Sequence, residues 1–168
     1  MPASFDPTRV PDASWRALGR ALVEGGLGER VLRETERILP ARHDALRLPL
    51  VHRALRRDPS TGAAIARLFV YDDALERDRV EAVLGAELVA QLVAAGALEV
   101  RGDRLVAHLH VTPFADVLVV SDGLTAHDPV IPPGPTTLEL SRCLPARIEG
   151  ARVLDLGCGP GSIAALLA

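Results

Sequence analysis

The glycine-rich stretch near the end of the chain constrains the fold more than any other feature. A short apolar run, Val153, Leu154 and Leu156, leads into alternate glycines and then into the alanine- and leucine-rich residues 162–168. This order predicts a strand, a tight turn and a helix. Glycines let the backbone turn sharply and let a ligand approach the main chain without meeting a Cβ atom. The segment therefore predicts a ligand-binding turn of an architecture in which strands and helices alternate.

Two common nucleotide-binding patterns do not fit this turn. The dinucleotide fingerprint G-x-G-x-x-G requires a glycine where the chain has Ser162, and the phosphate loop requires a lysine that the turn lacks. The turn instead has an acidic residue, Asp155, followed by Gly157, Gly159 and Gly161.

Residues 153–161, VLDLGCGPG, resemble motif I of the class I S-adenosylmethionine-dependent methyltransferases. The resemblance implies that S-adenosyl-L-methionine is the cofactor and that this segment is the first βα unit of a doubly wound, Rossmann-like domain. It also implies that Asp155 holds the amino group of the cofactor, often through water. The cofactor-binding residues that it implies are Asp155, Gly157, Cys158, Gly159 and Gly161. A structural βα turn without a ligand is the alternative for the segment.

A proline- and glycine-rich connector, residues 123–135, precedes this unit and predicts a domain boundary. Residues 131–137, IPPGPTT, are similar to the I-P-R-P-E-T-E segment found before motif I in methyltransferases that modify a glutamine of release factors. Thr136 and Leu138 stand where that pattern has its two glutamates, which puts glutamine specificity in doubt. The overall arrangement also resembles methyltransferases that modify ribosomal RNA. Residues 67–122 resemble an N-terminal domain that accompanies such enzymes in high-GC bacteria.

The middle of the chain predicts three short helices followed by a β-hairpin, which is the order of a winged-helix unit. The candidate recognition helix contains no arginine, and Gln91 is its one side chain that could read a base edge. We therefore favour a packing or substrate-orienting role over DNA reading. The first predicted helix begins at residue 61 and ends at Phe69 or Tyr71. The other two cover residues 77–84 and 87–95, and the hairpin covers residues 98–111 with its turn at Gly102 and Asp103.

The N-terminal region predicts a small helical unit. Apolar spacing indicates helices over residues 14–24, 29–39 and 44–57, the first with Asp12 or Ser14 as its N-cap and the last interrupted at Pro49. Residues 1–60 hold 11 Arg against 8 acidic residues, a charge of +3, while residues 61–168 hold 8 Arg against 14, a charge of −6. This excess is too small to indicate a nucleic-acid footprint. A basic cluster is interpreted as a solvated face: Arg47, Arg53, Arg56 and Arg57.

Two further elements flank the connector. An apolar strand is predicted over residues 117–121, and a helix is predicted over residues 136–144 with Leu138, Leu140 and Leu144 facing a core. The resulting fold class is an α+β accessory domain, helical and winged-helix-like, followed by the truncated start of a Rossmann-like domain. The predicted units are a helical region at residues 1–58, a winged-helix-like domain at 59–122, the connector at 123–135 and the start of the methyltransferase domain at 136–168.

The composition limits the protein class. It is 48% hydrophobic and 24% charged, which excludes disordered and collagen-like chains. No apolar run reaches the roughly 18 residues of a spanning helix. We therefore expect a cytoplasmic location and no membrane partner. All 19 basic residues are Arg, which we interpret as a coding bias without functional weight. The two cysteines, Cys143 and Cys158, support neither a disulfide framework nor a zinc site.

Other candidate sites are weaker. His108 and His110 are expected to share a strand face, but no third metal ligand lies nearby, so no metal site is predicted. Asp72 and Asp73 are interpreted as a helix end and not as an acid–base pair. The sequence assigns no catalytic residue.

The chain ends seven residues after Gly161. We therefore expect a fragment of a methyltransferase that acts on a macromolecule, a ribosomal RNA base or a protein glutamine, and that is inactive by itself because an acceptor site is missing. The alternative is a non-enzymatic winged-helix module that binds nucleic acid or protein and carries a vestigial glycine-rich motif. In either case the apolar side chains of the last segment need a cover: Leu154, Leu156, Ile163, Leu166 and Leu167.

Overall fold

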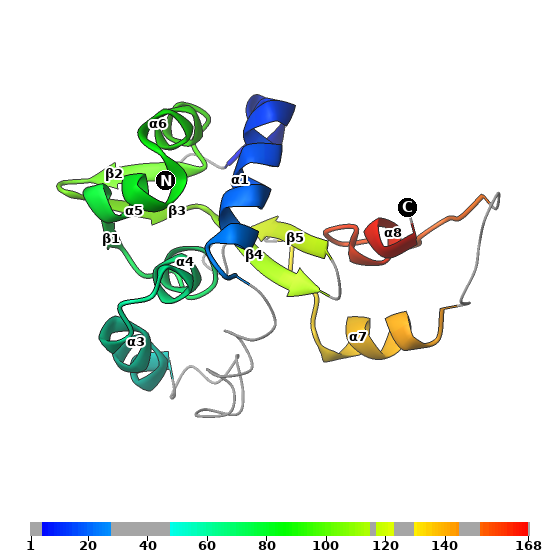
Figure 1. Ribbon diagram of the computed structural model, residues 1–168. Coiled ribbons are helices and arrows are strands. Elements are labelled where there is room, and N and C mark those ends of the chain that lie inside the picture. The colour runs from blue at the N-terminus through cyan, green and yellow to red at the C-terminus, as the bar shows by residue number, and fades with distance from the viewer. Residues whose placement is uncertain (1–4, 28–47, 115–116, 123–129, 145–151, 168) are drawn as a thin grey trace.

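The structure is a computed structural model that describes residues 5–27, 48–114, 117–122, 130–144 and 152–167. Within these ranges the chain forms seven α-helices, one 3₁₀ turn and two small antiparallel sheets, a mixed α+β arrangement (Figure 1). One hydrophobic core gathers side chains from Val10 to Val111, and a second, smaller cluster lies near the C-terminus. The predicted division into domains is not tested by this arrangement and stays a prediction.

The first α-helix, α1 (Asp12–Glu24), follows the short 3₁₀ turn η1 (Pro7–Arg9) and confirms the predicted N-terminal helix. The predicted cap is wrong, because the N-cap is Pro11 and Asp12 is already helical. Ser14 is buried, and its hydroxyl donates a hydrogen bond of 2.7 Å to Gln91 Oε1 instead of capping the helix. At the other end the amide of Leu27 donates to the carbonyl of Leu22 at 2.8 Å, which closes the helix with a Schellman turn.

Gly25, at the end of α1, lies too close to its neighbours to accept a side chain. A Cβ atom there would lie 2.3 Å from Ile65 Cδ1 and 2.8 Å from the carbonyl oxygen of Ala21. Gly19, inside the same helix, has open space around its Cβ position. We expect Gly25→Ala to lower the free energy of unfolding by about 1–3 kcal/mol through overpacking. Gly19→Ala should raise it by about 0.5–1 kcal/mol, because alanine favours the helix.

Urea denaturation of the two variants tests this pair. Equal destabilisation by both substitutions would contradict the packing argument, since only one of the two sites is crowded.

Two helices, α3 (Leu48–Arg57) and α4 (Thr61–Phe69), come next. The predicted helix over residues 29–39 and the start of the predicted helix at 44–47 lie outside the described residues. The interruption at Pro49 is wrong, because Pro49 is the second residue of α3, where a backbone N–H has no partner within the helix. In α4, Ser60 Oγ accepts a hydrogen bond from the amide of Ala63 and caps the helix. All residues of α4 after Thr61 are buried, so this helix lies at the centre of the core.

The predicted helices of the middle segment are confirmed, and the predicted hairpin is confirmed for residues 98–107. Helices α5 (Arg77–Leu84) and α6 (Ala86–Ala94) follow α4, and strands β2 (Leu98–Arg101) and β3 (Arg104–Ala107) form the hairpin, with Gly102 at a φ of 66° in its turn. A strand that the sequence did not reveal, β1 (Leu75–Glu76), pairs with β3 to complete an antiparallel sheet of order β1-β3-β2. Two residues are too short to show a period of two.

The alternating run that follows the hairpin turn divides between two sheets. Strand β3 ends at Ala107, opposite Leu98, the first residue of β2. After His108 the chain continues as β4 (Leu109–Phe114), which pairs with β5 (Val117–Asp122). The strand predicted over residues 117–121 is thus confirmed. His108 and His110 do not share a strand face, since His108 lies between the strands and its amide donates to the carbonyl of Ala97.

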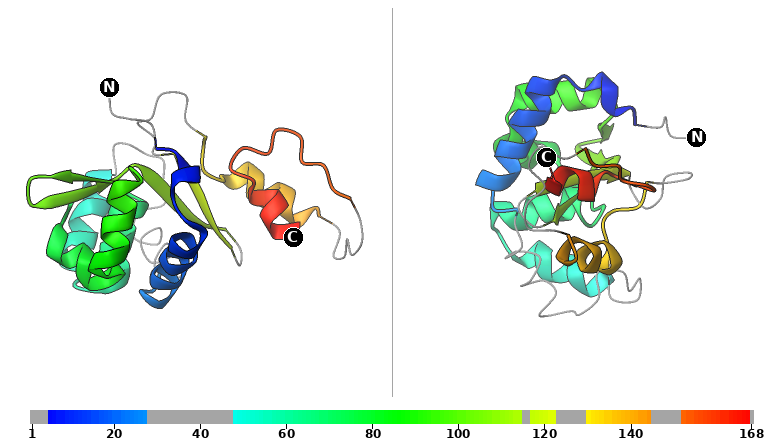
Figure 2. Two further views of the ribbon diagram at one scale, coloured as in Figure 1. Left: turned by 90° about the horizontal axis from the view of Figure 1, so that it is seen from above. Right: turned by 90° about the vertical axis from the view of Figure 1, so that its right-hand side faces the viewer.

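The β4–β5 ribbon, residues 109–114 and 117–122, packs against a different hydrophobic cluster on each of its faces. On one face Leu109 and Val111 belong to the main core. On the other face Phe114 and Val119 form the second cluster with Ile163. The ribbon therefore joins the main body, the part around the larger core, to the C-terminal helices, as the left view of Figure 2 shows.

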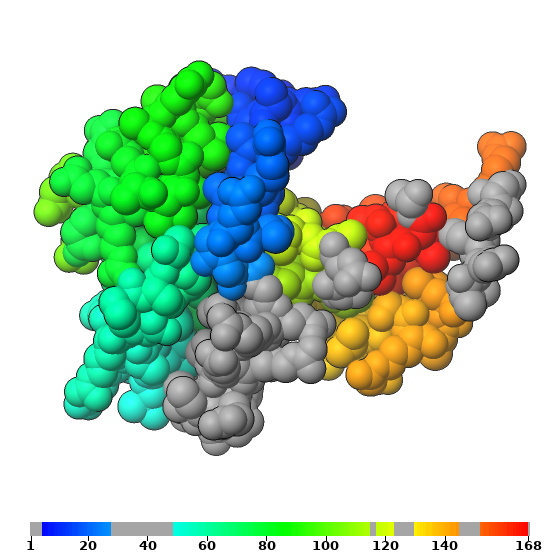
Figure 3. Space-filling view, viewed as in Figure 1, coloured from blue at the N-terminus to red at the C-terminus, as the bar shows by residue number. Residues whose placement is uncertain are grey.

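Those C-terminal helices are α7 (Pro135–Arg142) and α8 (Ser162–Leu167). The predicted helix before motif I is confirmed, but it ends at Arg142, and the inward direction of its leucines is wrong for Leu138 and Leu140, which are exposed. Leu144, beyond the helix, packs on the second cluster as predicted. Figure 3 shows the reason: this part of the chain projects from the main body, so α7 meets little protein surface.

The strand predicted before the glycine turn is wrong for this structure. Residues 152–155 belong to neither sheet, and Leu154 and Leu156 are 79% and 84% exposed. A strand needs a neighbour to receive its backbone hydrogen bonds, and none of the described strands runs beside this segment. The helix after the turn, α8, is confirmed, and its Ile163 is covered by Phe114 of β4 and Val119 of β5.

Candidate functional site

The glycine loop, residues 157–161, has a backbone conformation that only glycine adopts easily. Gly157, Gly159 and Gly161 have φ angles of 74°, 51° and 74°, and a Cβ atom at any of them would meet no other atom within 4 Å. The turn is closed by a hydrogen bond of 2.8 Å from the amide of Gly161 to the carbonyl of Cys158. The glycines are therefore required by the backbone and not by crowding, and they leave one side of the loop open.

Asp155 and Ser162 flank the glycine loop, and each has a buried oxygen without a hydrogen-bond partner. Asp155 is half-buried with its Oδ2 covered, and Ser162 is 2% exposed with its Oγ covered. An unsatisfied buried oxygen destabilises a protein by roughly 1–3 kcal/mol, so a group that supplies a donor here would be stabilising.

All five residues that the resemblance assigned to the cofactor thus lie on one described loop. Asp155 is half-buried, whereas Gly157, Cys158 and Gly159 are exposed. The thiol of Cys158 is free. The loop passes directly into α8, whose first two residues are buried against the ribbon.

The sequence predicts no metal site and no membrane-spanning helix. Across residues 5–27, 48–114, 117–122, 130–144 and 152–167, no group of three His, Cys, Asp or Glu side chains could hold a metal ion. His108 Nε2 lies 2.9 Å from Glu99 Oε2, and His110 is buried in β4. None of the helices in these ranges is long and apolar enough to cross a bilayer.

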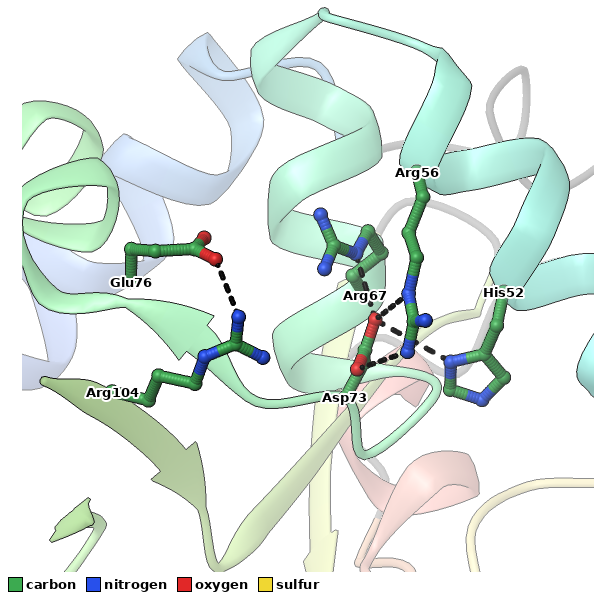
Figure 4. A network of polar contacts seen from close by, with 6 residues as sticks. All are labelled: His52, Arg56, Arg67, Asp73, Glu76 and Arg104. Atoms are coloured by element: carbon green, nitrogen blue, oxygen red, sulfur yellow. Dashed lines mark hydrogen bonds and ion pairs between the residues drawn. The ribbon is translucent and has the colours of Figure 1, made fainter. Parts of the chain in front are cut away.

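A second polar cluster, which the sequence did not reveal, is centred on Asp73 (Figure 4). Asp73 is 8% exposed and accepts hydrogen bonds from Arg56 Nε at 3.2 Å, Arg56 Nη2 at 3.0 Å and Arg67 Nε at 2.8 Å. His52 Nδ1 lies 3.5 Å from Asp73 Oδ2. The carboxylate therefore ties α3, α4 and the turn before β1 together.

The electrostatics of Asp73 follow from these contacts. Burial by itself would raise the pKa of Asp73, but the hydrogen bonds and charges of Arg56 and Arg67 outweigh burial and lower the pKa to about 2. Asp73 follows Asp72, whose φ of 51° is the one positive value for a non-glycine residue in the described chain. Side chains of α3 and α4 hold the carboxylate of Asp73, so this cluster links parts of the fold. We call it the clamp; it consists of His52, Arg56, Arg67 and Asp73.

The clamp also corrects the interpretation of the basic cluster. Arg56 is 58% exposed, yet its guanidinium is paired with Asp73 and is not merely solvated. Arg53 and Arg57 are exposed, as expected, and Arg47 lies outside the described residues. Sequence spacing could not show the pair, because Arg56 and Asp73 are brought together by the packing of α3 on α4.

The candidate recognition helix, α6, is packed against α1. Gln91, its one side chain suited to base reading, accepts the hydrogen bond from Ser14 Oγ and donates to Glu87 Oε1 at 3.3 Å. Both ends of the Gln91 amide are thus engaged within the protein.

Comparison with known proteins gives one family match. A family model described as a domain of unknown function, DUF7059, matches residues 35–108, a range that includes α3 to α6 and β1 to β3. No curated protein and no solved structure matches the chain. The matched range is less than half of the chain and ends before the ribbon and the glycine loop.

Proposed function

We propose that the glycine loop binds S-adenosyl-L-methionine. We further propose that the chain is part of a class I methyltransferase that acts on a macromolecule. The observation that carries the proposal is the loop itself: three alternate glycines in the left-handed region, open on one side, between an acidic residue and a helix. This arrangement provides main-chain access for a ligand and a carboxylate beside it.

The residues present fit this cofactor. Asp155 Oδ2 lacks a donor, and the cofactor has an ammonium group that can donate. Gly157, Gly159 and Gly161 leave room for the rest of the molecule beside the backbone. When bound, S-adenosyl-L-methionine supplies an electrophilic methyl group. The role of this chain is to hold and orient it.

The middle segment supports a winged-helix-like accessory unit that orients the acceptor, a ribosomal RNA base or a protein glutamine. Its element order is α4, β1, α5, α6 and the β2–β3 hairpin. DNA reading by α6 is not part of the proposal, because Gln91 is bound to Ser14 and Glu87.

Isothermal titration of S-adenosylhomocysteine into the chain tests the proposal. We expect binding, and we expect Asp155→Asn to weaken it roughly 10- to 100-fold, since a charge-assisted hydrogen bond contributes about 1.5–3 kcal/mol. The matched control is Asp103→Asn, which changes an exposed carboxylate in the hairpin turn and should leave the affinity unchanged.

A non-enzymatic binding module is the second candidate, and a specific observation favours it. Large apolar side chains are exposed within residues 130–140 and 153–156, which is typical of a protein-binding surface. Absence of any S-adenosylhomocysteine binding by the wild-type chain would overturn the cofactor proposal and favour this module. The exposed residues are Val130, Ile131, Leu138, Leu140, Val153, Leu154 and Leu156.

A further inference from the structure

The two ends of the glycine loop differ in their support. Before the loop, residues 152–155 lie outside both sheets, and Leu154 and Leu156 are exposed. After the loop, the amide of Ala165 donates to the carbonyl of Gly161 at 2.8 Å, and Ser162 and Ile163 are buried. The conformation of the loop therefore depends on α8.

Helix α8 needs support of its own. It has six residues, and an isolated helix shorter than about 12 residues is marginal in water. Its support is the second cluster, in which Ile163 packs with Phe114 of β4 and Val119 of β5. Leu166 and Leu167 also pack against this cluster.

The ribbon that supplies Phe114 and Val119 is fixed on its opposite face. There Leu109 and Val111 are fully buried in the main core. The ribbon lies between the main body and the pair α7 and α8 in Figure 1 and in the left view of Figure 2. A physical chain of contacts thus runs from the main core through the ribbon and α8 to the loop.

We propose that Phe114 and Val119 are positioning residues for the cofactor loop. They hold α8, and through α8 they favour the loop conformation that binds the cofactor. The expected effect of Phe114 and Val119 on cofactor affinity rests on the proposed function. Their effect on the stability of α8 does not depend on any ligand. It assigns the ribbon, which lies outside motif I, a part in cofactor binding.

The experiment compares Phe114→Ala, Phe114→Leu and Val111→Ala, with two measurements on each. The first is the dissociation constant for S-adenosylhomocysteine. Phe114→Ala should weaken binding roughly tenfold, because the apparent affinity falls with the fraction of chains whose loop is competent. Phe114→Leu, which keeps an apolar side chain, should retain most of the affinity. Val111→Ala perturbs the opposite face of the same strand and should change it less than about twofold.

The second measurement is amide hydrogen exchange. Phe114→Ala should reduce protection of the α8 amides at least about tenfold while protection in α4 is unchanged, which also shows that the variant is folded. Val119→Ala, a smaller change, should act in the same direction. Wild-type protection in α8 of Phe114→Ala and Val119→Ala would overturn the proposal.

The two measurements separate the two proposals. If the wild type does not bind S-adenosylhomocysteine, the proposed function fails, and the exchange data still decide whether the ribbon holds α8. If the wild type binds and Phe114→Ala binds equally well, the positioning role fails while the cofactor site stands.

Discussion

Replacing Asp73 with asparagine is expected to lower the free energy of unfolding by about 3 kcal/mol at pH 7. Arg67 is buried, and the substitution leaves its guanidinium without a counter-charge in the interior. Breaking a buried ion pair from one side destabilises proteins by about 3–5 kcal/mol, and the exposure of Arg56 places the effect at the lower end. Urea denaturation at pH 7 measures it.

The same clamp predicts a dependence of stability on pH. The pKa of Asp73 is lowered to about 2 in the folded chain from the ordinary 3.8, so its contribution is fully present above about pH 4 and is lost as the pH falls through 2. The difference corresponds to about 2.5 kcal/mol. In the Asp73→Asn variant this part of the acid destabilisation should be absent. We expect the wild type and the variant to converge in stability between pH 4 and pH 2.

Asp103→Asn serves as the control for the clamp. It removes an exposed carboxylate and should change the free energy of unfolding by less than about 0.5 kcal/mol. Equal effects of Asp73→Asn and Asp103→Asn at pH 7 would contradict the view that Asp73 holds α3 and α4 together.

Leu105→Ala is expected to destabilise the chain by about 2–5 kcal/mol. Leu105 is fully buried in β3, where it lies opposite Leu75 of β1 and Val100 of β2. Truncation removes apolar contact and leaves a cavity at the centre of the sheet, which relaxes only in part. Thermal or urea denaturation of the variant measures the loss.

The matched control for Leu105 is Leu50→Ala. Leu50 has the same side chain, but it is 53% exposed on α3. We expect less than about 1 kcal/mol there, because little apolar area leaves water at this position. Similar losses at both positions would show that the burial of the β3 leucine does not set its contribution.

Much of the local structure could be predicted from the sequence. Apolar spacing revealed α1, α5 and α6, since one face of each meets the core. The dipeptide Gly102-Asp103 between alternating runs revealed the β2–β3 hairpin. The helix α8 could also be predicted from its sequence. The tight turn before it could be predicted as well, because its three glycines adopt the positive φ angles that such a turn requires. These features depend on residues close together in the chain.

What only the tertiary structure decided depends on partners far away in the chain. Strand β1 exists because β3 offers it hydrogen bonds, and residues 152–155 form no strand because no described strand lies beside them. Arg56 pairs with Asp73 because α3 packs on α4, and Ser14 meets Gln91 because α1 packs on α6. The sequence alone thus determined helices, turns and the glycine loop, whose causes are local dihedral preferences and periodicity. Sheet pairing, buried ion pairs and the support of α8 by the ribbon required the three-dimensional arrangement, because they join residues that no local pattern connects.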